Sequence, residues 1–91
     1  SVPQYHLRIG RIYIERKEFP EAEKYFKEAL KYAKDLKLKR DIAECYEAIG
    51  DMHMEKGSKK KGERYYLKAI EGYREGRYKV QEEGVIRKIL T

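Results

Sequence analysis

The sequence predicts an all-α fold of antiparallel helix-turn-helix repeats, and three observations lead to this prediction. Charged residues make up 42% of the 91 residues and hydrophobic residues 41%, which is typical of amphipathic helices and too apolar for a disordered chain. Two separate segments recur after the same interval, because Gly10 matches Gly50 (50 − 10 = 40) and Ala29 matches Ala69 (69 − 29 = 40). Within each copy, apolar residues recur at three- and four-residue spacing, which places them on one helical face.

The first copy, about residues 3–37, predicts two helices. Ile9, Ile12 and Tyr13 share one face of the first helix. Pro20 fits the start of the second helix, where its missing N–H leaves no hydrogen bond unmade. The inner stripe predicted for the second helix consists of Ala22, Tyr25, Phe26, Ala29, Leu30 and Ala33.

The second copy also predicts two helices. Asp41 followed by Glu44 is the pattern of a capping box and predicts the start of its first helix. Gly57 predicts the end of that helix, Ser58 the cap of the next one, and Gly76 the end of the second helix. This copy spans about residues 40–76, and its inner faces are predicted to be Ile42, Cys45, Tyr46, Ile49, Met52 and His53, then Tyr65, Tyr66, Ala69, Ile70 and Tyr73.

A terminal helix of about residues 78–90 completes a single predicted domain of residues 1–91. This helix is either the start of a third copy or a cap over the second pair. Repeat arrays usually need about three repeats and a polar cap, so we expect the exposed ends to associate with a second chain or with further repeats. The apolar face of the terminal helix consists of Val85, Ile86, Ile89 and Leu90.

Two glycines lie in the middle of predicted helices. A glycine there costs about 1 kcal/mol relative to alanine. Gly10 and Gly50 therefore predict that the paired helix approaches closely at these positions.

This pattern resembles the tetratricopeptide repeat. The resemblance implies a right-handed α-solenoid of two repeats plus a terminal helix, which acts as a protein–protein interaction scaffold. The usual period is about 34 residues, and the interval of 40 found here (50 − 10 = 40) resembles a longer-repeat branch that includes bacterial peptide-pheromone receptors and eukaryotic polarity and motor-adaptor scaffolds. The matching positions are His6, Ile9, Gly10 and Tyr13, then Tyr46, Ile49, Gly50 and His53 in first helices, and Ala22, Phe26 and Ala29, then Gly62, Tyr66 and Ala69 in second helices.

The resemblance also implies a concave groove lined by the first helix of each pair. Because the second copy contributes mostly carboxylates, we expect a basic, partly apolar peptide or helix as the ligand, with Leu7, Ile14 and Met54 as apolar contacts. Reversing the charges of Glu47 and Asp51 is expected to abolish binding, unless the carboxylates only solvate a helix face. The groove residues are Gln4, Leu7, Arg11, Ile14 and Glu15 from the first copy, and Glu44, Glu47, Asp51, Met54 and Glu55 from the second.

Charge leaves two further functions open. The net charge is +6, of which residues 1–57 carry +1 (12 − 11) and residues 58–91 carry +5 (10 − 5). Basic stripes interleaved with tyrosines are compatible with nucleic-acid binding, although intervening glutamates and ion pairs such as Glu23 with Lys27 disfavour it. A peptide-sensing regulatory module of a larger protein is the other alternative. The stripes are Lys24, Lys27, Lys31 and Lys34, and Lys60, Arg64 and Lys68.

Neither an enzyme nor a cofactor is expected. His6 and His53 occupy packing positions. Cys45 lies on an apolar face, where we expect it to be a small buried hydrophobic residue. No zinc-type spacing and no glycine-rich phosphate loop occur in the sequence. A single cysteine fits a reducing interior, so a cytoplasmic location is expected, and no apolar run approaches the ~20 residues that span a membrane.

Overall fold

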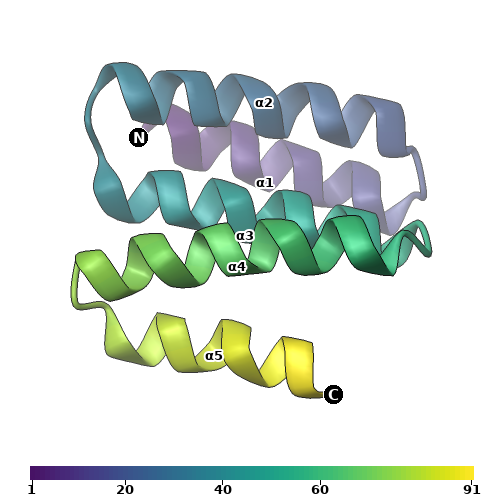
Figure 1. Ribbon diagram of the computed structural model, residues 1–91. Helices are drawn as coiled ribbons and strands as arrows, with labels where there is room; N and C mark the ends of the chain where they lie inside the picture. Colours follow the sequence, from purple (N-terminus) through teal and green to yellow (C-terminus); the bar gives the residue numbers. More distant parts are fainter.

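The computed structural model describes residues 1–91 and contains five helices without any strand (Figure 1). The pairs α1–α2 and α3–α4 each form an antiparallel hairpin, the hairpins pack through α2 and α3, and α5 packs against α4. None of the five helices is both long enough and apolar enough to cross a membrane. The helices are α1 (Val2–Glu15), α2 (Phe19–Asp35), α3 (Lys39–Glu55), α4 (Lys59–Glu75) and α5 (Lys79–Leu90).

The same turn joins every pair of successive helices. After α1, the N–H of Lys17 donates to the carbonyl of Ile14 at 2.9 Å and the N–H of Glu18 donates to that of Tyr13 at 2.9 Å. This is a Schellman motif, which requires one residue with positive φ. Four residues take this conformation at intervals of 20: Lys17 (φ 60°), Lys37 (φ 56°), Gly57 (φ 85°) and Arg77 (φ 62°).

The helix ends at Gly57 and Gly76 are confirmed, and one predicted helix start is wrong. Gly57 follows α3 within the turn and Gly76 is the C-cap of α4, although Gly76 has φ −82° and the left-handed residue after α4 is Arg77. The motif places positive φ at the second residue beyond the helix, whichever residue type stands there. The predicted capping box is wrong, because the turn lets α3 begin at Lys39, with Leu38 as its N-cap, and Asp41 lies inside the first turn.

Small and large side chains alternate in two hydrophobic clusters that share α3. A Cβ atom added at Gly10 would collide with the ring of Phe26, and one at Gly50 would lie 2.6 Å from the ring of Tyr66. The predicted close approach is therefore confirmed, with an aromatic ring of the paired helix filling the space. The first cluster holds Leu7, Ala22, Phe26, Ala29, Ala33, Cys45, Ala48, Ile49 and Met52, and the second holds Ala43, Tyr66, Ala69, Ile70, Tyr73 and Val85.

Candidate partner-binding groove

Two adjoining hollows lie along α1 and α3 and share Arg11. Most of the predicted groove residues line the first hollow. These are Arg11, Ile14 and Glu15 of α1, which face Asp51, Met54 and Glu55 of α3. The first hollow has a volume of about 300 Å³ and is completed by Tyr66 of α4 and Lys88 of α5. The second has a volume of about 310 Å³ and is lined by Arg11, Arg40, Glu44, Glu47, Tyr73 and Gln81.

Two predicted groove residues, Gln4 and Leu7, lie outside both hollows, and Leu7 is the buried one of the two. Its side chain is only 2% exposed and belongs to the core cluster that α1 forms with α2 and α3. The hydrophobic effect drives a leucine at this contact into the interior. Leu7 is therefore a core residue, and the expectation that it touches a partner was wrong.

Three of the carboxylates expected to attract a ligand, Glu44, Glu47 and Asp51, already accept hydrogen bonds within the chain. Asp51 accepts from Arg11 Nη1 at 3.0 Å, from Lys88 Nζ at 3.0 Å and from the hydroxyl of Tyr66. Asp51 is therefore surrounded by two cations and one hydroxyl donor. Its negative charge is therefore balanced by cations of the protein itself.

Glu47 and Glu44 also accept hydrogen bonds from other helices. Glu47 accepts from Lys88 Nζ at 2.8 Å and from the hydroxyl of Tyr73 at 2.9 Å. Glu44 accepts from the side-chain amide of Gln4 at 2.8 Å. The freely acidic wall that the sequence predicted on α3 is thus corrected to a network that ties α1, α4 and α5 to α3.

The network keeps its tyrosine and lysine donors protonated to a higher pH than usual. Burial raises the pKa of Tyr66 and of Tyr73, and the hydrogen bonds and charges of Asp51 and Glu47 raise them further. Burial alone would lower the pKa of Lys88, but its contacts with these two carboxylates outweigh that effect and the pKa is raised.

What remains available in the groove is apolar at its centre and acidic at its edge. Ile14 and Met54 are half-buried, whereas Glu15 and Glu55 are exposed at the ends of α1 and α3. Each of these carboxylates lies at a helix C-terminus, where the helix dipole adds further negative potential. The surface can therefore hold an apolar side chain beside a cation.

The one cysteine is not a nucleophile. Cys45 is fully buried in the core, as predicted. Burial, followed by the charges of Glu44 and Asp41, raises the pKa of its thiol to about 12. The thiolate that covalent chemistry needs is therefore absent at neutral pH.

The groove predicted from the sequence did not include Lys88, Tyr66 or Tyr73, which line the two hollows. One usable signal existed, since Arg11 and Asp51 occupy the same position in successive copies (51 − 11 = 40), so their opposite charges could have indicated a pair. Lys88 carried no such signal, because its reach to α3 depends on how α5 lies against the second pair.

The fold defines an α-helical repeat array of two antiparallel helix pairs and one further helix. The family model described as tetratricopeptide repeat matches residues 2–75. The chain belongs to the tetratricopeptide repeat family, a family of non-catalytic repeat modules for protein–protein interaction. No curated protein and no solved structure shows a significant match to this chain.

Proposed function

We propose that the chain binds a peptide or helix of a partner protein in the groove between α1 and α3. The observation that carries this proposal is the shared hollow in which Ile14 and Met54 form an apolar centre beside Glu15 and Glu55. An apolar anchor buried in such a centre supplies most of the affinity, and a neighbouring basic residue supplies orientation. The ligand we propose is therefore a short segment with an aliphatic or aromatic side chain next to Lys or Arg.

The internal pairing changes how this proposal must be tested. Reversal of Glu47 and Asp51 would break the network around Lys88, so a loss of binding could reflect altered structure. Glu15 and Glu55 are exposed and form no ion pair, and lysine at a helix C-terminus agrees with the dipole. The double variant Glu15→Lys, Glu55→Lys is therefore the cleaner probe.

The experiment is a selection from a random peptide library displayed on phage. Against the unmodified protein, we expect enrichment of peptides with an apolar residue beside Lys or Arg. These peptides should be lost from a selection against Glu15→Lys, Glu55→Lys and kept with Asp35→Lys, Glu83→Lys, a control at exposed positions outside both hollows. Enrichment without this composition, or equal recovery with both variants, contradicts the proposal.

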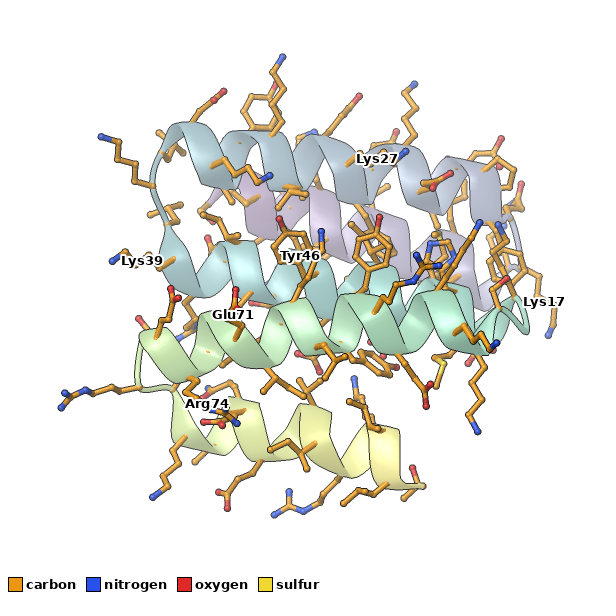
Figure 2. All side chains as sticks on the ribbon, viewed as in Figure 1. Lys17, Lys27, Lys39, Tyr46, Glu71 and Arg74 are labelled. Atoms are coloured by element: carbon orange, nitrogen blue, oxygen red, sulfur yellow. The ribbon has the colours of Figure 1, made fainter.

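We also propose that the α4–α5 end of the array associates with a second copy. Leu67 is 58% exposed and Leu90 is 78% exposed there, and Leu90 takes the register of Gly50 (90 − 50 = 40). Leu90→Glu should reduce the mass measured by sedimentation equilibrium from dimer to monomer, and a monomer before substitution contradicts this. The α4–α5 end carries a hollow of about 710 Å³, and Arg74, one of its lining residues, is labelled in Figure 2. The hollow is lined by Leu67, Ile70, Glu71, Arg74, Glu75, Ile86, Ile89 and Leu90.

A further inference from the structure

A fourth hollow opens on the face where α2, α3 and α4 meet, away from the α1–α3 groove. Figure 2 shows this face, with the labelled Tyr46 between α2 and α4 and with α1 lying behind. The hollow has a volume of about 270 Å³ and is lined by Glu23 of α2, His53 of α3, and Lys61, Arg64, Tyr65 and Lys68 of α4.

His53 is the buried polar group of this hollow. Its side chain is only 6% exposed, and its ring stacks on that of Tyr65 with centroids 5.5 Å apart and an interplanar angle of 17°. The Nδ1 atom of the ring has no hydrogen-bond partner in the protein. A buried nitrogen without a hydrogen-bond partner is costly, and with less than 1 Å² of accessible surface it is reached only when a neighbouring side chain moves.

The three cations of the hollow are free of carboxylates. Lys61, Arg64 and Lys68 form no ion pair, whereas the one acidic residue of the lining, Glu23, pairs with Lys27 at 3.6 Å. The lining therefore carries a formal charge of +2 (3 − 1). An anion would complete it.

Lys68 is held in position by two aromatic rings. Its Nζ atom lies 5.4 Å from the ring centroid of Tyr46 and 5.7 Å from that of Tyr65. Cation–π contacts of this kind restrict where the ammonium group can lie. The ammonium group therefore lies beside the hollow before any ligand binds.

The first pair of helices has carboxylates at two of the three cationic positions. Lys61 corresponds to Glu21 (61 − 21 = 40) and Lys68 to Glu28 (68 − 28 = 40), whereas Arg64 corresponds to another cation, Lys24 (64 − 24 = 40). Glu28 lies 3.3 Å from a ring nitrogen of His6. The first pair therefore has one cation at these positions, where the second pair has three.

We propose that this hollow binds a phosphate group, either as free phosphate or as the phosphomonoester of a phosphorylated side chain. Lys61 and Lys68 would each contact an oxygen, and the guanidinium fork of Arg64 would bind two oxygens at once. The ring of His53 lines the same hollow, so its resonances and its titration respond to an anion bound there. The ring of Tyr65 forms the apolar wall against which a phosphorylated side chain would lie.

The test is an NMR titration of the full chain with inorganic phosphate, in which the ring nitrogens of His53 are observed. Sodium chloride at equal ionic strength is the reference. We expect a saturable shift of the His53 resonances with phosphate alone. Lys61→Gln, Lys68→Gln should weaken binding at least about tenfold, whereas Glu23→Gln should strengthen it by removing the one opposing charge.

The pH dependence of the His53 signal gives a second readout. Burial, and after it the charge of Lys56, lowers the pKa of this histidine. The charged groups around it are Glu23 and Lys27 from α2, Lys56 at the end of α3, and Lys61, Arg64 and Lys68 from α4. A bound anion favours the imidazolium, so its titration midpoint should rise in phosphate.

Three outcomes of the phosphate titration would overturn the proposal: no saturable shift, a shift that sodium chloride reproduces, or an equal loss in Lys24→Gln, Lys31→Gln. This control removes two exposed cations of α2 outside the hollow. Salt-sensitive binding of single-stranded DNA without any response of His53 would also overturn it, in favour of diffuse electrostatic attraction. Tighter binding of O-phosphotyrosine than of inorganic phosphate identifies a phosphorylated side chain as the ligand, and the reverse order identifies free phosphate.

Discussion

Arg11 and Asp51 occupy the same position in two successive repeats and are joined by an ion pair of 3.0 Å. The pair bridges α1 and α3, and Lys88 reaches Asp51 from α5. This carboxylate of α3 also accepts from the hydroxyl of Tyr66, so it links α3 to α1, α4 and α5, the other helices that border the first hollow. The groove is held in shape by the residues that the sequence suggested for binding a ligand.

Asp51→Ala should lower the free energy of unfolding by about 1–3 kcal/mol, because it leaves the hydroxyl of Tyr66 and two cations without their shared acceptor. Urea unfolding followed by circular dichroism measures this change. Glu55→Ala is the matched control at an exposed carboxylate without an ion pair, and should change stability by less than about 0.5 kcal/mol. Equal effects of the two substitutions would show that the network adds nothing to stability.

Stability should fall as the pH rises above about 10. The ordinary pKa values of tyrosine and lysine are 10.0 and 10.5, and those of Tyr66, Tyr73 and Lys88 are raised in the folded state. The folded protein therefore keeps protons that the unfolded chain releases, and this contribution is complete at lower pH and lost in the alkaline range.

Urea midpoints between about pH 8 and about pH 11 measure this dependence. The double variant Tyr66→Phe, Tyr73→Phe removes two of the groups, so its stability should fall less steeply. Tyr5→Phe, which changes a phenol that is 69% exposed, is the control and should keep the original slope. An unchanged slope in the double variant would count against the assignment of these two tyrosines.

Two glycines should respond to alanine in opposite directions. Gly57 has φ 85°, so Gly57→Ala should destabilise the fold by about 1 kcal/mol through backbone strain. Gly84 lies within α5 with open space around it, so Gly84→Ala should stabilise by about 0.5–1 kcal/mol. Thermal unfolding of both variants decides the matter, and shifts of Tm in the same direction would contradict the turn geometry.

Gly10→Ala should destabilise the first pair by about 1–3 kcal/mol, because the added methyl group meets the ring of Phe26. Combining it with Phe26→Leu gives the new methyl group room. The loss in the double variant should then be smaller than the sum of the two single losses, which urea unfolding measures. Strict additivity would mean that the two residues do not share this space.

The helices were predictable from the sequence, because the repetition of Gly10 and Gly50 set the register, and most packing faces followed from the apolar spacing. The face predicted for α1 was wrong in part, since Ile12 is 55% exposed and the buried leucine of this helix is Leu7. The helix ends were less predictable from the sequence. Asp41 looks like a cap, yet the Schellman turn at Lys37 reverses the chain earlier and starts α3 at Lys39. A turn defined by backbone geometry overrides a capping preference of about 1 kcal/mol.

The groove could be located from the sequence, but its charge could not. Ile14 and Met54 do line one hollow. The net charge of the wall, however, depends on distances between helices, and Lys88 neutralises Glu47 only because α5 lies against the second pair. No spacing rule along the chain reports a contact between residues 41 positions apart (88 − 47).

The central claim, peptide binding between α1 and α3, is tested most directly by titration calorimetry with the peptide that binds best in the phage selection. We predict that Glu15→Lys, Glu55→Lys weakens its affinity by at least about tenfold, whereas Asp35→Lys, Glu83→Lys leaves it within about twofold. Equal affinities for the two variants, with both folded by circular dichroism, would place the binding surface elsewhere and contradict the account.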